Sequence, residues 1–272
     1  MASPLVVLTD FYAVSARALS YAAGLAVSMK TELVLLHARH DVLLAPIDYG
    51  SYSPVSDNAT DRVLQTLADA QPVPTQVDVS DRELTEAVRA TVHRHHPLLL
   101  VLGRPETADA PVEIVTGTAM DLLTTVPYPL LVVPPPAGDT FPPRRLLLAV
   151  DGEPFVLLRH QNVLRQLLRL AEGTLNVVRV TDDSHARLGA EAILRTVADN
   201  DLTEVLPPSQ LYEVYDRSVV SGILAEAARQ EADLLVVVAR QHSLIGSLFH
   251  RSVTAQLLEH SPVPVLVLPA ED

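Results

Sequence analysis

Short runs of apolar residues, rich in Val and Leu, alternate along the chain with longer segments in which apolar and polar residues are mixed. Continuous apolar runs are typical of strands buried on both faces of a parallel sheet, and the mixed segments have the length of helices. The regular alternation predicts right-handed strand–helix–strand crossovers, with helices covering both faces of the sheet.

The predicted strands are 5–9, 32–38, 74–79, 98–103 and 129–133 in the first half, and 145–150, 174–180, 210–215, 233–239 and 264–268 in the second. The predicted helices are 13–29, 59–70, 82–95, 116–125 and 156–171. The last of these is expected to stop at Gly173, because glycine is a common helix stop signal.

The two halves of the chain repeat the same landmarks in the same order. The matching segments are LVVLTD (5–10) and LLLAVD (146–151), PLLLVLG (97–103) and DLLVVVA (233–239), and PYPLLVVP (127–134) and PVPVLVLP (262–269). Between them the stretch PPPAGDTFPP (134–143) is typical of a stiff, extended linker. We therefore predict two α/β domains, at 1–138 and 144–272, joined by a linker at 139–143.

Two long segments point to a family. The first copy opens with LVVLTDFYAVSARALSYAAGLAVSMKTELVLLHA (5–38), and the second ends with ADLLVVVARQHSLIGSLFHRSVTAQLLEHSPVPVLVLP (232–269). The first segment resembles the opening of a universal stress protein domain, and the second resembles its end. The resemblance implies that each copy is a doubly wound domain with a five-stranded parallel sheet, of the adenine nucleotide alpha hydrolase-like type.

The same resemblance implies a way in which the two copies pair. Universal stress proteins commonly dimerise through the last strand of the sheet, an edge strand with unpaired backbone groups. Strands 129–133 and 264–268 are therefore expected to pair with each other, which makes the chain a pseudo-twofold internal dimer. A homodimer of the whole chain is a further option.

ATP-binding members of this family carry a glycine signature after the fourth strand, which reads Gly, two residues, Gly, nine residues, Gly, then Ser or Thr. Glycines let backbone N–H groups approach the phosphates, and the start of the next helix offers the positive end of its dipole. In the second copy the three glycine positions hold Val238, Gln241 and Arg251, and only Ser252 is retained. This copy is not expected to hold ATP in the family's usual way.

The first copy comes closer to the signature. Gly103 ends the fourth strand, and Gly117-Thr118 is expected to open the last helix, but the middle glycine is absent and the spacing is one residue too long. The loop between them is acidic and would repel a triphosphate unless a divalent ion intervened. An adenine nucleotide, ATP, is therefore a candidate cofactor for domain 1 alone.

Several polar residues have two interpretations each. Asp10 and Asp151 follow the first strand of each copy, where an aspartate could contact a nucleotide or cap the next helix. His93 and His96 have the spacing of metal ligands, but a solvated helix end explains them more simply. The histidines at 242 and 250 form a cluster with Arg251, which could bind an anion or pack against neighbours. His37 is read as structural.

Composition narrows the function classes. A net charge of −13 without a basic stripe disfavours nucleic-acid binding, and the absence of cysteine excludes disulfides and thiolate chemistry. No apolar run has the length of a membrane span, so a cytoplasmic protein without membrane contact is expected.

Neither a nucleophile elbow, nor a zincin motif, nor a phosphate-binding Walker loop occurs. The favoured function is thus a non-enzymatic universal stress response protein that binds a ligand or partner. The alternative is weak nucleotide binding or hydrolysis in domain 1. A scaffold with two vestigial sites is a third option.

Overall fold

The structure is a computed structural model. It describes residues 3–9, 13–39, 57–104, 112–135, 142–157, 160–181, 190–202, 210–240 and 252–270. The predicted contact Asp10 lies outside these residues, as do Gln241, the histidines at 242 and 250, and Arg251.

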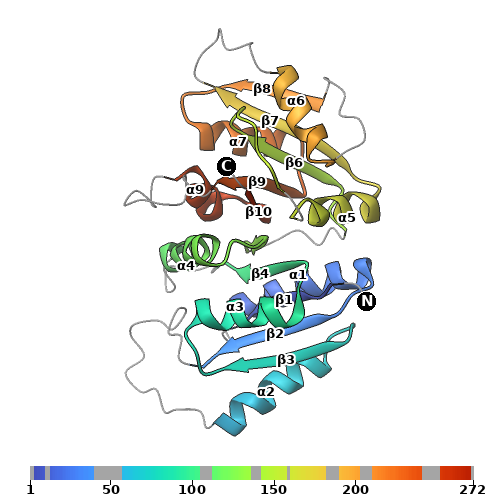
Figure 1. Ribbon diagram of the computed structural model, residues 1–272, viewed down its shortest axis with the longest axis vertical. Helices are drawn as coiled ribbons and strands as arrows, with labels where there is room; N and C mark the ends of the chain where they lie inside the picture. Colours follow the sequence, from blue (N-terminus) through green and yellow to red (C-terminus); the bar gives the residue numbers. More distant parts are fainter. Residues whose placement is uncertain are drawn as a thin grey trace.

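The described residues form one ten-stranded sheet in the order β3-β2-β1-β4-β5-β10-β9-β6-β7-β8 (Figure 1). We call the part with β1–β5 domain 1 and the part with β6–β10 domain 2. The strands of domain 1 are β1 (Leu5–Leu8), β2 (Leu33–Ala38), β3 (Thr75–Ser80), β4 (Leu99–Gly103) and β5 (Leu130–Val133). Those of domain 2 are β6 (Arg145–Val150), β7 (Thr174–Thr181), β8 (Leu211–Tyr215), β9 (Leu234–Arg240) and β10 (Val265–Ala270). Within each domain all neighbouring strands are parallel.

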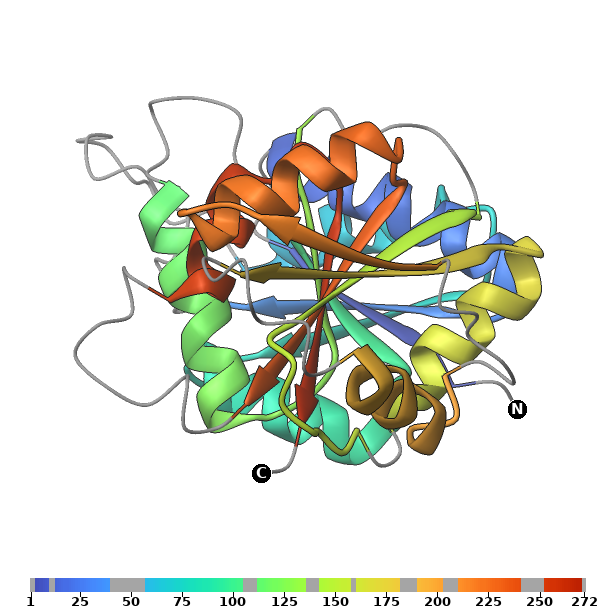
Figure 2. The ribbon, with the colours of Figure 1, turned by 90° about the horizontal axis from the view of Figure 1, so that it is seen from above.

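Helices cover both faces of the sheet, as Figure 2 shows from above. One face carries α1 (Ala13–Met29), α2 (Asp57–Asp69), α5 (Gln161–Ala171) and α6 (Ala190–Asp199). The other carries α3 (Leu84–His95), α4 (Val112–Thr125), α7 (Val219–Arg229) and α9 (Val253–His260). Alternate strand residues enter the two cores: Leu5 and Val7 pack on the first face, and Val6 and Leu8 on the second. Because both faces of the central strands are buried, these strands need apolar residues at nearly every position, which explains the continuous runs. The edge strands β3 and β8 are only partly buried and include polar residues.

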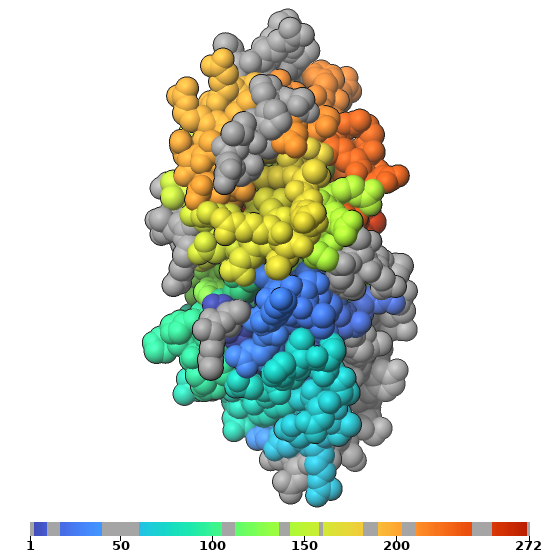
Figure 3. All heavy atoms as spheres, turned by 90° about the vertical axis from the view of Figure 1, so that its right-hand side faces the viewer, coloured from blue at the N-terminus to red at the C-terminus, as the bar shows by residue number. Residues whose placement is uncertain are grey.

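The two domains join through the one antiparallel pair, β5 with β10, as predicted. Leu131 lies opposite Leu266, Val132 opposite Val265, and Leu130 opposite Val267. The repeat matches Leu131 with Leu266, so in this central pair each leucine lies opposite its own counterpart. A pseudo-twofold axis therefore passes between them, as in an isologous dimer interface. Helix α4 packs against α9 beside this axis, and α1 packs against α5 on the other face, where the two helices meet at the waist of the molecule in Figure 3.

The strand and helix predictions agree with the structure except at two helix starts. Helix α4 begins at Val112 instead of 116, and its first turn holds Glu113, whose charge suits the positive end of the dipole. Helix α5 begins at Gln161 instead of 156, because residues 151–157 are held in a loop described below.

Gly173 follows α5, but its role differs from the predicted one. The left-handed residue at the helix end is Glu172, with φ 46° and ψ 39°. A β-carbon on Gly173 would lie 2.8 Å from the carbonyl oxygen of Arg144. Glycine is required there because the start of β6 passes too close for any side chain.

Asp233 ties the amino ends of β6 and β9 together. Its Oδ2 accepts hydrogen bonds from the backbone N–H groups of Arg144 (3.0 Å) and Arg145 (2.9 Å), and its Oδ1 accepts from the Arg145 guanidinium (2.9 Å). Burial alone would raise the pKa of Asp233, but the hydrogen bonds from Arg145 and Arg144 outweigh burial and lower it.

The same substitution at two glycines should have opposite effects on stability. Gly117→Ala should stabilise the protein by about 0.5–1 kcal/mol, because Gly117 lies inside α4 and a β-carbon there meets nothing within 4 Å. Gly173→Ala should destabilise it by about 1–3 kcal/mol, through the clash with Arg144. Urea unfolding measures both free-energy changes, and changes of equal sign would contradict the different surroundings of the two glycines.

Asp233 should contribute stability that depends on pH. Because its folded pKa is lowered, the contribution is present above the unfolded pKa of about 3.9 and is lost as pH falls through the folded value. Asp233→Asn should therefore be less stable than the wild type at pH 7, and the gap should close in acid. Urea unfolding free energies of both proteins between roughly pH 7 and pH 2.5 test this. A gap independent of pH would show that the charge of Asp233 is irrelevant.

Candidate functional site

The candidate sites lie where the strand order reverses. In domain 1 this is between β1 and β4, and in domain 2 between β6 and β9. Loops that leave the carboxyl ends of such strands run to opposite faces of the sheet, which is why ligands of doubly wound folds bind there. Gly103 and Asp151 stand at these ends in their respective domains.

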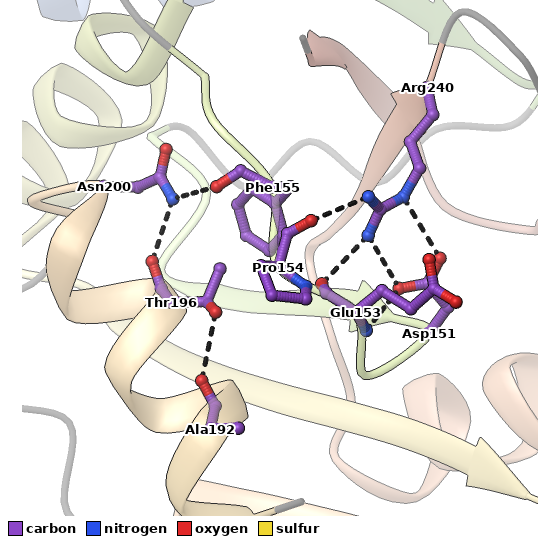
Figure 4. Close-up of polar contacts among 8 residues, drawn as sticks. All are labelled: Asp151, Glu153, Pro154, Phe155, Ala192, Thr196, Asn200 and Arg240. Atoms are coloured by element: carbon purple, nitrogen blue, oxygen red, sulfur yellow. Dashed lines mark hydrogen bonds and ion pairs between the residues drawn. The ribbon is translucent and has the colours of Figure 1, made fainter. Parts of the chain in front are cut away.

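In domain 2 the strand ends are bridged by an ion pair (Figure 4). Arg240, the last residue of β9, donates from Nη2 to Asp151 Oδ1 at 3.0 Å and from Nε to Asp151 Oδ2 at 3.3 Å. Its guanidinium also donates to the carbonyl oxygens of Glu153 (2.9 Å) and Pro154 (2.7 Å). The Arg240 side chain is only 9% exposed, whereas that of Asp151 is 60% exposed, so the fourfold contact holds a buried guanidinium at the ends of β6 and β9.

The far end of the same loop is held by Asn200, which follows α6. Asn200 Oδ1 accepts the backbone N–H of Leu157 at 2.7 Å, and its Nδ2 donates to the carbonyl oxygens of Phe155 and Thr196, each at 2.8 Å. Figure 4 shows Asn200 and Arg240 on opposite sides of the loop. Asn200 is buried, and Phe155 and Leu157 enter the core. The loop 151–157 is therefore a fixed part of the domain, and it replaces the first turns that α1 has in domain 1.

The turn after β6 requires glycine. Gly152 has φ +96°, a left-handed conformation that disfavours side chains. A β-carbon there would also lie 2.9 Å from Nε of Arg179, which projects from β7. Asp151 Oδ1 accepts the backbone N–H of Glu153 at 3.0 Å, an Asx-type turn. Asp151 does not cap a helix, because α5 starts ten residues later; one of its two predicted roles is thus wrong.

Domain 1 arranges its strand ends differently. Gly103 is buried and lies opposite Val133 of β5. The next residue, Arg104, donates its backbone N–H to the Val133 carbonyl at 2.8 Å, and its side chain extends into domain 2. At the end of β1, the Thr9 carbonyl accepts a hydrogen bond from His37 Nδ1 at 3.0 Å. His37 thus joins β1 to β2, in keeping with a structural role.

The sequence predicts that Gly117 and Thr118 open the last helix, but in the structure they do not. Because α4 begins at Val112, both lie inside it, where backbone N–H groups belong to the helical hydrogen-bond ladder. Thr118 Oγ1 donates to the Ile114 carbonyl at 2.9 Å. This position does not support the predicted phosphate contact. Ser252 does stand at the start of α9 as predicted, and its side chain makes no capping hydrogen bond.

The histidines at the end of α3 contact neighbouring side chains. His95 Nε2 lies 3.5 Å from Asp78 Oδ2, beside the 2.6 Å pair of Arg94 with the same carboxylate. The rings of His93 and His96 contact each other at a centroid distance of 6.1 Å. Among the described residues, no group of three or more His, Cys, Asp or Glu side chains could hold a metal ion.

Sequence reasoning missed Arg240 and Asn200. The glycine signature could have pointed to Arg240. Val238 and Gln241 occupy the first two glycine positions, and Arg240 lies between them at a position where domain 1 has a proline. Asn200 carried no such signal, because a buried asparagine that binds a distant loop looks like any polar residue after a helix.

Comparison with known proteins places the fold. The family model "Universal stress protein family" matches residues 1–134 and 143–269. A universal stress protein from Archaeoglobus fulgidus superposes with a TM-score of 0.67 at 16% identity, over 98% of this chain and 98% of that one. A putative universal stress protein from Pseudomonas aeruginosa gives 0.63 at 17%, over 99% and 94%.

The fold also matches a protein of another kind. The cytoplasmic domain of a prokaryotic cation chloride cotransporter gives a TM-score of 0.56 at 12% identity, over 99% of this chain and 96% of that one. No curated protein matches the sequence. Within the described residues, no helix is both long and apolar enough to cross a membrane.

The family model matches the chain twice, and the structural matches extend over both domains together. The pairing of β5 with β10 fits the dimer interface that the resemblance implied. This chain belongs to the universal stress protein family, of which it carries two domains in tandem.

Proposed function

We propose that this protein acts by binding and not by catalysis, and that domain 1 alone can accept an adenine nucleotide. Domain 2 serves as a closed structural partner. The observation that carries the proposal is the ion pair of Arg240 with Asp151, which lies where the family resemblance would put a nucleotide.

Opening the domain 2 site would be costly. A nucleotide between β6 and β9 would have to displace a buried guanidinium that makes four hydrogen bonds, and charged groups that lose their partners in a buried site are strongly destabilised. In addition, Val238 stands at the first glycine position and packs against the core, so the backbone carries a branched side chain where the signature has none. Two independent obstacles thus support closure.

The sequence of domain 1 has no counterpart of Arg240, because a proline stands at the matching position. The strand registers match Gly103 with Val238, one residue away from the alignment of the sequence repeat, so the strand end here has no side chain. The side chain of Arg104 is directed into domain 2 and leaves the end of β4. Glu113 in the first turn of α4 would repel phosphate, and we therefore propose the magnesium complex of the nucleotide as the bound form. Gly103 is the predicted contact that the geometry supports best.

Binding without turnover fits the chemistry of the strand ends. In domain 2 the carboxylate of Asp151 accepts hydrogen bonds from Arg240, and in domain 1 His37 is hydrogen-bonded to the backbone carbonyl of Thr9. None of the catalytic motifs considered above occurs in the sequence. A binding role is therefore the simpler proposal.

Calorimetry with ATP and Mg²⁺ tests whether domain 1 alone binds a nucleotide. We expect at most one nucleotide per chain, and its loss in Gly103→Val, which gives domain 1 the residue of domain 2. The reciprocal control, Val238→Gly, should gain no site while Arg240 is present. Released phosphate should not exceed the buffer rate. Two nucleotides per chain, or turnover, would overturn the proposal, and no heat at all would overturn nucleotide binding by domain 1.

A double-mutant cycle measures how firmly domain 2 is closed. Asp151→Asn and Arg240→Met should show a coupling of about 1–2 kcal/mol in unfolding free energy, because one partner is buried. The control pair, Arg165 with Asp201, is more exposed on the arginine side and should couple by less than about 1 kcal/mol. If the two pairs coupled equally weakly, Arg240 would be a surface contact and not a closure.

A further inference from the structure

Arg104 connects the two domains at the point where the domain 1 site begins. Its backbone N–H is bound to Val133 of β5, so the main chain is fixed within domain 1. Its Nη1 donates to the carbonyl oxygens of Leu258 (2.9 Å) and Glu259 (2.8 Å), which lie in the last turn of α9 in domain 2. One side chain thus spans the domain boundary.

These carbonyls are groups that a helix cannot satisfy itself. The last four C=O groups of a helix have no partner within it, and a positive charge there also suits the helix dipole. Ser261 N–H takes the Leu257 carbonyl at 2.9 Å, which leaves the next two to Arg104. Burial lowers the pKa of the Arg104 guanidinium, but an arginine remains charged at neutral pH. The contact is therefore a charge-assisted helix cap supplied by another domain.

The cap is one-sided. The buried positions of α3 match those of α7, which places Leu224 where domain 1 has Arg89. The registers of β4 and β9 with their neighbouring strands also match, which places Ala239 where domain 1 has Arg104. Neither Leu224 nor Ala239 has a side-chain donor. Arg89 donates to the Thr125 carbonyl at the end of α4, at 3.3 Å. Domain 1 thus supplies both arginines: Arg89 at the end of its own helix α4, and Arg104 at the end of α9 in domain 2.

We propose that Arg104 is an interdomain latch, through which the state of the β4 end in domain 1 sets the stability of α9 in domain 2. The proposal builds on the function proposed above, since the β4 end is where a ligand of domain 1 would bind. Helix α9 packs on both α4 and α7, so a change at its end reaches the axis and the body of domain 2. The coupling joins the β4 end of domain 1 to α9 of domain 2 and acts equally in both directions. Ala239 cannot form the equivalent contact between the β9 end and α4, because it has no side-chain donor.

Hydrogen–deuterium exchange of the full chain without ligand tests the latch. Arg104→Met should speed exchange in α9 by roughly tenfold or more, since two charge-assisted hydrogen bonds are lost, and should leave α4 unchanged. Arg89→Met is the matched control and should loosen α4 but not α9. Arg104→Lys, which keeps the charge, should fall between Met and the wild type. An unchanged α9, or equal loosening of both helices, would overturn the proposal.

The coupling is tested separately by a change at the strand end. Gly103→Val should alter exchange in α9 when Arg104 is present and should have no further effect on α9 in the Arg104→Met background. Equal effects in both backgrounds, or none in either, would overturn the coupling. This experiment needs no nucleotide. If calorimetry finds no ATP binding while these results hold, the proposed ligand is wrong and the latch stands.

Discussion

The antiparallel pairing of β5 with β10 is the contact on which the rest of the structure depends. It turns two five-stranded sheets into one, so the apolar cores on its two faces run through both domains. It also brings α4 against α9 and α1 against α5. Strands β5 and β10 would be exposed edges in separate domains, but here they lie at the centre of the sheet. Their backbone groups are therefore paired and cannot recruit strands of other molecules.

Most of this architecture could be read from the sequence, because strands buried on both faces leave a strong signal. Helix α1 was predicted with the bounds that the structure shows, and the ten strands within one or two residues. The pairing of the domains followed from family resemblance and not from periodicity, since an apolar strand bracketed by prolines does not reveal its partner. Helix starts were harder: α5 is shortened by tertiary contacts from Arg240 and Asn200, which local pattern cannot express.

The candidate sites were less predictable than the fold. The loss of the glycine signature in domain 2 was visible in Val238, but what replaced the ligand was not. An arginine at the end of a strand has many possible partners, and only the folded chain shows that Arg240 meets Asp151. In domain 1 a glycine pattern placed Gly117 at a helix start, whereas the helix extends further and encloses it. Spacing along the chain predicted chemistry poorly where loops changed length.

The register of β5 and β10 has a consequence for how this chain could evolve. In a dimer of identical subunits every contact occurs twice, so an arginine that reached across the axis would have to be accommodated on both sides. Fusion of the two domains keeps Leu131 opposite Leu266 but releases all other positions from that symmetry. One-sided features such as Arg104 and Arg240 are available only to a chain of this kind. Covalent linkage thus allows a symmetric scaffold to carry a contact on one side of the axis only.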